Sequence, residues 1–342
     1  MTFRRFVQLA SLALLGTFSV AAFAAASAKP LVLLGRTNFP GYDGDVDHLF
    51  ADLKENKLFV AAEDHGTVEV FNLITGRHVK TLTTFKTPHA FFLVPGTHRL
   101  IVSDDSGPRI IDDRGYQVLG HLDDLAPGAD TEYYDPSTKH LFIVTGGDDV
   151  HLKNCWLNEI DPWTARVLRK HKFNSAHVEA LRAEQHGDRM FINIADKNEV
   201  DVLSKTTLDV IARWPIVGAK TNLSMSLDEA HHRLFIVTRN PTKLFVLDTN
   251  SGKTVATVDV PAINDGTSFD VARQRLYVPG AVGELGVVQE IDPDRYREVA
   301  VVPTARGAKS ETYVPALNEL FVGVSPQYSK PEVAGVIRFK AE

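Results

Sequence analysis

The chain has 342 residues with 37 Lys and Arg, 43 Asp and Glu, and a single cysteine, Cys155. An acidic chain without basic runs is a poor candidate for nucleic-acid binding, which depends on neutralising phosphates, so we expect no nucleic-acid partner. The single cysteine excludes an intrachain disulfide and a Cys-x-x-Cys-His haem attachment, and we expect Cys155 to be a buried, unreactive side chain.

The first 28 residues have the three parts of a secretory signal peptide. Arg4 and Arg5 precede an apolar stretch, Leu9–Val20, and Ala26–Ala28 is a small-residue cleavage pattern. Cleavage near Ala28 leaves residues 29–342, with 37 − 2 = 35 basic against 43 acidic residues. We predict a periplasmic or secreted protein exported by the general secretory route, with twin-arginine export as the alternative. No other segment is long and apolar enough to cross a membrane, so the mature chain should have no transmembrane segment.

Seven short hydrophobic runs recur along the mature chain at intervals of 41 to 49 residues. Each is rich in β-branched and aromatic residues and too short for a globular helix, which favours a strand. Because both faces are apolar, each strand should be covered on both sides, like the inner strand of a propeller blade between neighbouring blades. The runs are Leu58–Ala61, Leu100–Val102, Leu141–Val144, Met190–Ile192, Leu234–Val237, Leu276–Val278 and Leu320–Val322.

A second strand follows each run, and six units then contain an outer strand. The seventh unit ends after Phe339 without one, whereas Leu31–Arg36 at the mature N-terminus has no inner strand before it. The N-terminal segment is therefore predicted to complete the last blade, which removes an unpaired sheet edge. The sequence thus predicts an all-β fold in which residues 29–342 form a single seven-bladed β-propeller domain.

Several stretches carry a resemblance to a known family: Asp47–Asp52, Ala129–Asp135, His177–Glu179, Asn222–Glu229 and Arg233–Gly252. With these motifs the chain resembles the YVTN-type β-propellers, the YncE-like secreted or periplasmic proteins, over nearly all of its mature length. The resemblance implies the propeller fold and export. It is weak for function, because one fold hosts many activities.

Counting back eleven residues from the start of each run compares equivalent positions near the mouth of the channel. These positions are Asp47, His89, Asp130, Glu179, Leu223, Asp265 and Lys309. Six of the seven are titratable, and Asn222 beside Leu223 would supply an amide if the register slipped by one. Close by in the same segments are His48, Glu132, His177 and Glu311. We predict that this set lines one mouth of the channel and binds a ligand there.

Carboxylates that converge on a funnel must find compensation or shift their pKa values upward. One form of compensation is a hard cation such as Ca²⁺, for which the candidate ligands are Asp47, Asp130, Glu179 and Asp265. The alternatives are a small polar or cationic ligand and a solvated charge network that involves Lys309 and the histidines. No cofactor motif is evident.

Three further segments have plain structural interpretations. Asp43–Asp47 fails the EF-hand pattern, because His48 and Lys54 stand where Gly and Glu are needed, and is predicted to be a polar turn. Asp148–His151 is predicted to be a solvated insertion. Arg239 follows an inner strand and is predicted to stabilise a turn at the opposite end of its blade.

The chain lacks the Gly-x-Ser-x-Gly, His-Glu-x-x-His, P-loop and Cys-x-x-Cys motifs. The leading hypothesis is therefore an exported binding or scaffold protein, expected to be a monomer, that presents its channel mouth to a small molecule or a protein partner. Whether it is an enzyme stays open. The alternative is a lactonase-like hydrolase, with a carboxylate or His89 as general base and with Ca²⁺ assistance. A third hypothesis is a partner subunit in electron transfer.

Overall fold

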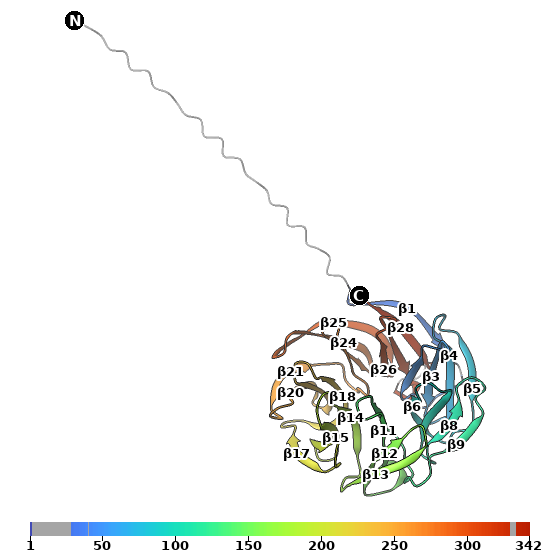
Figure 1. Cartoon of the computed structure of the whole chain (residues 1–342). Helices are drawn as coiled ribbons and strands as arrows, with labels where there is room; N and C mark the ends of the chain where they lie inside the picture. The colour runs from blue at the N-terminus through green and yellow to red at the C-terminus, as the bar shows by residue number, and fades with distance from the viewer. Residues whose placement is uncertain (2–28, 40, 329–332) are drawn as a thin grey trace.

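The computed structural model describes residues 1, 29–39, 41–328 and 333–342 of the chain (Figure 1). The predicted signal peptide therefore lies, apart from Met1, outside the described residues. Among the described residues no helix has the length and apolar character needed to span a membrane.

Seven four-stranded antiparallel sheets form the blades of a closed ring around a central channel (Figure 1), as the sequence predicted. The innermost strands of blades 1 to 7 are β2 (Leu49–Asp52), β6 (Pro88–Leu93), β10 (Glu132–Asp135), β14 (Val178–Ala183), β18 (Lys220–Asp228), β22 (Ser268–Asp270) and β26 (Ala308–Val314). The second strands are β3 (Lys57–Ala62), β7 (Arg99–Asp104), β11 (His140–Gly146), β15 (Arg189–Ile194), β19 (Arg233–Asn240), β23 (Arg275–Gly280) and β27 (Glu319–Val324).

The third and outer strands complete each blade. The third strands are β4 (Thr67–Asn72), β8 (Arg109–Asp112), β12 (Cys155–Asp161), β16 (Glu199–Ser204), β20 (Thr242–Asp248), β24 (Val282–Asp292) and β28 (Gly335–Ala341). The outer strands are β5 (His78–Leu82), β9 (Val118–His121), β13 (Arg166–Phe173), β17 (Val210–Pro215), β21 (Thr254–Asp259), β25 (Arg295–Arg306) and, for blade 7, β1 (Leu31–Asn38). Two short 3₁₀ turns, Asp148–Val150 and Pro326–Tyr328, interrupt loops.

The seven hydrophobic runs occupy the second strand of each blade and not the innermost strand, which corrects the sequence interpretation. A separate innermost strand precedes each run, formed by the segment that was expected only to lead into it. The second strand has sheet neighbours on both sides and adjacent blades on both faces, so its residues are buried almost without exception. Complete burial therefore identifies this strand better than nearness to the channel does.

The ring closes as predicted, through the N-terminal strand. β1 pairs antiparallel with β28, from Leu31 opposite Ala341 to Asn38 opposite Gly335, with an irregularity between Leu33 and Gly35. The side chain of Leu31 is buried in the core that blade 7 shares with blade 6. β1 therefore supplies both backbone hydrogen bonds and apolar packing to blade 7.

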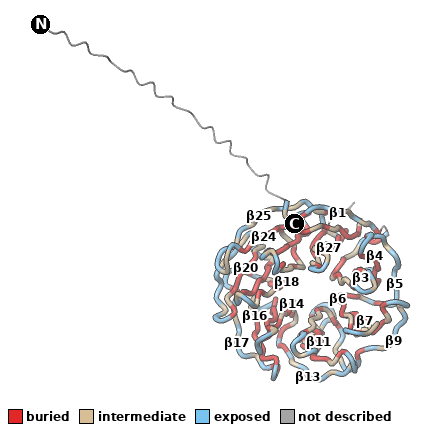
Figure 2. The backbone as a smooth tube through the Cα atoms, turned by 45° about the horizontal axis from the view of Figure 1, so that its top comes forward, coloured by how far each residue is buried: buried red, intermediate tan, exposed pale blue. Residues whose placement is uncertain are grey.

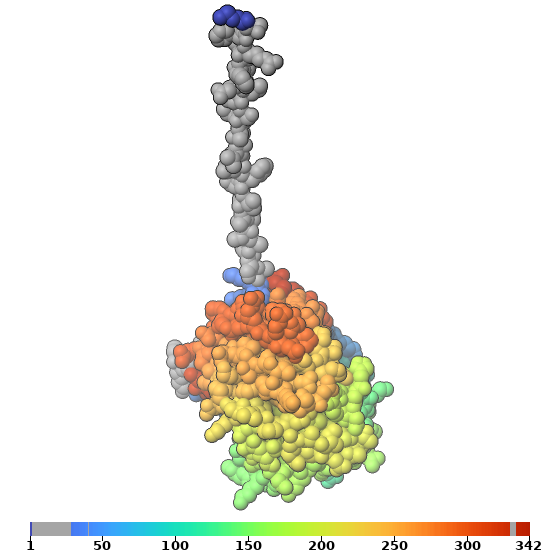
Figure 3. Space-filling model, turned by 90° about the vertical axis from the view of Figure 1, so that its left-hand side faces the viewer, coloured from blue at the N-terminus to red at the C-terminus, as the bar shows by residue number. Residues whose placement is uncertain are grey.

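The hydrophobic core consists of layers between neighbouring blades, and the outer strands alternate between half-buried and exposed residues (Figure 2). Between blades 1 and 2, for example, the ring centroids of Phe59 and Phe91 lie 6.1 Å apart. Viewed from the side, blades 5, 6 and 7 follow one another around the rim in chain order (Figure 3). Each buried aromatic side chain stabilises the fold by about 1.5–3 kcal/mol through its removal from water.

Candidate functional site at the channel mouth

A cavity of about 360 Å³ lies at one end of the channel. All seven positions that the eleven-residue spacing identified line it: Asp47, His89, Asp130, Glu179, Leu223, Asp265 and Lys309. They lie at or just before the start of the innermost strands, which all begin at this end of the ring. The spacing places them together because each blade uses a similar length of chain between the channel mouth and its second strand.

The other predicted residues are placed as follows. His48, Glu132, His177 and Glu311 line the same cavity. Asn222 does not: it is fully buried, and its Nδ2 donates hydrogen bonds to Asn193 Oδ1 at 2.9 Å and to the Glu199 carbonyl at 3.0 Å. The register does not slip, and Leu223 occupies the wall in blade 5.

Sequence reasoning missed Asp45, Glu63, Asp149, Arg182 and Arg239, which also line the cavity. The placement of Arg239 at the opposite end of its blade was wrong. In an antiparallel hairpin the end of the second strand returns to the start of the first, so both reach the same mouth. Counting five residues forward from the start of each run gives Glu63, Asp105, Gly146, Ala195, Arg239, Ala281 and Ser325, of which Glu63 and Arg239 line the cavity.

The segment predicted to be a polar turn and the one predicted to be a solvated insertion also contribute carboxylates. The loop Asp43–Asp47 brings Asp45 and Asp47 to the cavity, and the insertion Asp148–His151 brings Asp149. Nine of the residues that line the cavity are Asp or Glu, against one Lys and two Arg. The wall therefore has an excess of acidic groups.

His89 is held between two carboxylates. Its Nδ1 lies 3.0 Å from Asp47 Oδ2 and its Nε2 lies 3.3 Å from Asp105 Oδ1. Burial favours the neutral imidazole, but the hydrogen bonds to Asp105 and Asp47 outweigh it and raise the pKa of His89 well above its ordinary value. With both ring nitrogens occupied as donors, His89 is held as an imidazolium and is unsuited to act as a general base.

Asp47 also contacts His48, whose Nδ1 lies 2.8 Å from Asp47 Oδ1. Burial works against the imidazolium here as well, yet the charge of Asp47 raises the pKa of His48 to about 9. A third histidine, His177, hydrogen-bonds Glu179 at 2.5 Å, and this bond raises the pKa of His177 to about 9. The three histidines thus supply part of the positive charge at the mouth.

Four carboxyl groups of the wall titrate far above their usual range. Burial raises the pKa of Glu63, Glu132 and Glu311 to about 8, and that of Asp130 to about 7. Glu132 accepts a hydrogen bond from Ser103 at 2.6 Å and Glu311 accepts one from Ser268 at 2.7 Å, each through one oxygen. The other oxygen of each group has no hydrogen-bond partner in the part of the chain that the structure describes. The charges of the protein alone therefore do not compensate these acids fully.

Two sets of possible metal ligands occur in this cavity, with ligand atoms within 4.8 Å of one another. One is Asp47, Glu63 and His89, and the other is Asp47, His48 and Asp130. Of the four predicted calcium ligands, Asp47 and Asp130 come together, whereas Glu179 and Asp265 belong to neither set. Asp265 instead pairs with Lys309 and with Arg239.

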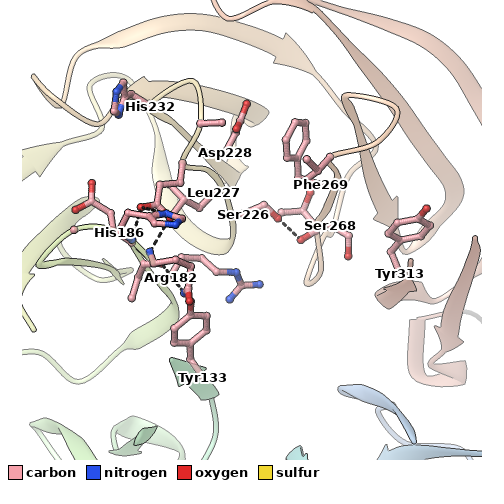
Figure 4. A pocket seen from close by; sticks show the side chains of 18 of the residues that line it. Tyr133, Arg182, His186, Ser226, Leu227, Asp228, His232, Ser268, Phe269 and Tyr313 are labelled. Atoms are coloured by element: carbon pink, nitrogen blue, oxygen red, sulfur yellow. Dashed lines mark hydrogen bonds and ion pairs between the residues drawn. The ribbon is translucent and has the colours of Figure 1, made fainter. Parts of the chain in front are cut away.

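A larger cavity of about 810 Å³ opens at the opposite end of the channel, over blades 4, 5 and 6 (Figure 4). Arg182, Thr267 and Ser268 line both cavities and lie between them. The guanidinium carbon of Arg182 lies 5.8 Å from the centre of the Tyr133 ring. The channel is therefore divided into an acidic chamber and a wider chamber that meet at Arg182.

The fold and the site together define an all-β, seven-bladed propeller with an acidic chamber at one channel mouth. The chain matches no model of a known protein family, and no curated protein is significantly similar to it.

Proposed function

We propose that this protein is an exported, YVTN-like propeller that binds a small polar ligand carrying positive charge in the acidic chamber. One observation carries the proposal: nine carboxyl groups surround a cavity of about 360 Å³, and burial keeps four of them from ionising at their ordinary pH. A cation placed among these carboxyl groups would favour their ionised forms and would be attracted electrostatically to them. An alkylammonium group or a divalent ion such as Ca²⁺ fits this chemistry.

Thermal unfolding of residues 29–342 tests the proposal, because a ligand that binds the native state raises the unfolding midpoint. After EDTA treatment, the protein is titrated with Ca²⁺, Mg²⁺, Mn²⁺, spermidine or tetramethylammonium, with glucose and citrate as neutral and anionic probes. We expect at least one cation to raise the midpoint and citrate to leave it unchanged. A response to none of the cations would overturn the proposal.

Variants then locate the binding. Asp130→Asn and Glu132→Gln keep the shape of two wall residues but cannot ionise when the cation binds, so each should lower the affinity for the responding cation about tenfold, a loss of about 1.4 kcal/mol. The matched control is Asp209→Asn, an exposed residue in the turn before the outer strand β17. An equal loss in the control would assign the effect to overall charge and not to the chamber.

The alternative occupant of the mouth is a protein partner, which would present a basic segment to the same acids. Pull-down with the mature chain, repeated with the Asp130→Asn variant, separates this case from a small ligand. The scaffold role is favoured if a partner binds the mature chain but not the Asp130→Asn variant, and if no small cation raises the unfolding midpoint.

A second candidate function, hydrolysis of a lactone, is favoured by Asp130. A carboxyl whose pKa is about 7 can accept a proton from water near neutral pH. Asp130 is therefore a better candidate for a general base than His89, which is held between two carboxylates. A lactone panel assayed with and without Ca²⁺ tests this function, and turnover that persists in Asp130→Asn would contradict the assigned role.

We also propose that the chain is exported to the periplasm or outside the cell as a monomer. The support is the N-terminal pattern of Arg4, Arg5, the apolar stretch and Ala26–Ala28. Fractionation of cells that express the full chain, N-terminal sequencing of the product and light scattering check the location, a cleavage site near Ala28 and the molecular mass.

A further inference from the structure

Asp228, His231 and Glu290 form a cluster at the boundary between blades 5 and 6, away from the acidic chamber. Asp228 ends β18, His231 lies in the turn that follows, and Glu290 belongs to β24 of the next blade. His231 Nδ1 lies 2.6 Å from Asp228 Oδ2 and 3.2 Å from Glu290 Oε1. One ligand atom from each residue lies within 4.8 Å of the other two.

Glu290 is the unusual member of this cluster. It is 2% exposed, and neither of its carboxylate oxygens has a hydrogen-bond partner among the described residues. A buried carboxylate without such partners is costly, because it has lost its water and gained little in return. The nearby guanidinium of Arg233 already binds Asp248 at 2.9 Å and Asp294 at 2.6 Å. The group between the two carboxylates is the His231 imidazole, which supplies a positive charge there only when it is protonated.

Blades 3 and 4 show what fills the equivalent place. In blade 4 the backbone amide of Lys205 donates a hydrogen bond to the carbonyl of Asp188. In blade 6 the backbone amide of Glu290 donates the equivalent hydrogen bond to the carbonyl of Gln274, so Lys205 and Glu290 occupy corresponding positions. Lys205 Nζ lies 3.2 Å from Asp135, which ends β10 just as Asp228 ends β18. Where blades 3 and 4 are joined by an Asp–Lys pair, blades 5 and 6 therefore bring two carboxylates and a histidine together.

We propose that Asp228, His231 and Glu290 bind a divalent transition-metal ion of the zinc class, which joins blades 5 and 6 in place of a lysine ammonium. One imidazole nitrogen and two carboxylate oxygens are a donor set that such ions accept. Bonds of about 2 Å in tetrahedral geometry separate ligand atoms by about 3.4 Å. His231 Nδ1 lies 3.2 Å from Glu290 Oε1, near this spacing, whereas its 2.6 Å contact with Asp228 Oδ2 must lengthen to admit the ion. Asp228 also lines the wide chamber, from which water can reach the fourth coordination position.

The histidine and Glu290 must lose their protons to coordinate the ion. Burial, with the charge of Asp228 next, raises the pKa of Glu290. Because a metal ion displaces protons from its ligands, binding should release protons and weaken at acidic pH. The other charged groups that face Glu290 are Arg233, which favours the carboxylate, and Asp292, which opposes it.

The test measures zinc stoichiometry and stability of residues 29–342 by calorimetry and thermal unfolding with ZnCl₂. The informative variant is Glu290→Lys, which installs the pair that Lys205 forms with Asp135. We expect it to lose one zinc equivalent relative to the wild type and to unfold, in EDTA, no lower than the wild type does. His231→Gln should lose the same zinc equivalent. When Co²⁺ is added in place of Zn²⁺, the visible absorption band of the bound ion should be absent from both variants.

Two controls separate this site from the acidic chamber and from simple charge effects. Asp130→Asn removes a carboxylate of the acidic chamber and should leave the zinc ion between blades 5 and 6 bound. The zinc stoichiometry of this site therefore does not depend on whether the acidic chamber binds a cation. Asp113→Asn alters the carboxyl that His98 contacts at 2.9 Å, at the boundary between blades 1 and 2, and should also leave it intact. If Glu290→Lys fails to fold, Glu290→Gln replaces it in the test and should likewise lose one zinc equivalent. An unchanged zinc stoichiometry in both His231→Gln and the folded Glu290 variant overturns the proposal.

Discussion

Lys309 forms an ion pair with Asp45 across 3.2 Å, which joins the last blade to the loop that precedes the first. The same ammonium pairs with Asp265 of the neighbouring blade 6 segment. Lys309 is 2% exposed, and although burial opposes its charge, Asp265 and Asp45 raise its pKa well above the ordinary value. One buried lysine therefore compensates two acids of the chamber where the ring closes.

Lys309→Met should destabilise the protein and strengthen cation binding together. Removal of the ammonium takes the lysine partner away from Asp45 and leaves Asp265 with Arg239, a loss of about 3 kcal/mol in the free energy of unfolding. The freed carboxylates then attract a ligand cation more strongly. Urea unfolding and calorimetry with the cation that stabilises the wild type measure the two effects. Weaker cation binding in a folded Lys309→Met protein would contradict the assigned role of these acids.

The stability of the native protein should fall as the pH rises from about 5 to 9. The pKa values of Glu132 and Glu311 are raised to about 8 in the folded state, so their stabilising contribution is complete below the unfolded value and is lost as the pH passes through 8. His48 and His177, raised to about 9, act in the same direction over the higher part of this window. Unfolding midpoints across this pH range measure the slope.

Neutral variants identify the groups that cause the slope. Glu132→Gln and Glu311→Gln keep the hydrogen-bonding shape and no longer titrate, so each should flatten the pH dependence. Asp209→Asn, exposed on the rim, should not. A slope that stays unchanged in the double variant would show that these carboxyls ionise normally.

The sequence predicted the fold well because the propeller repeats its chemistry once per blade. Seven hydrophobic runs and one unpaired segment, Leu31–Arg36, were enough to derive the number of blades and the closure. The same regularity placed ten of the eleven predicted site residues at the cavity. Three predictions were wrong. The hydrophobic runs form the second strands and not the innermost strands, and Asn222 is buried in the wall. Arg239 was assigned to the wrong end of its blade because the return of the hairpin was not considered.

The acids of the interblade cluster show why contacts between blades could not be predicted from the sequence. Asp228 and Glu290 are far apart in sequence, and neither belongs to a metal-binding motif. They meet because consecutive blades pack side by side, with the end of an innermost strand facing the third strand of the next blade. Sequence spacing alone does not show which of these boundary positions lacks a lysine partner.

The contribution of ring closure to stability can be measured within β1 itself. Leu31 is 3% exposed and packs in the core of blade 7, whereas Leu33 on the same strand is 61% exposed. Leu31→Ala should lower the free energy of unfolding by about 2–3 kcal/mol through the cavity it leaves. Leu33→Ala, the matched control, should change it by less than about 0.5 kcal/mol. Equal effects in urea unfolding would indicate that β1 does not close the ring in solution.

Cys155 should be inert in the native protein. It is 2% exposed at the start of β12, and burial raises the pKa of its thiol to about 12, so almost no reactive thiolate exists near neutral pH. Ellman's reagent should not label the folded chain and should label a single thiol after unfolding in guanidinium. Its neighbours in the core include Phe173 and Val178, so access requires blades 3 and 4 to separate. Rapid labelling under native conditions would therefore reveal local opening at that boundary, which the labelling rate would then measure.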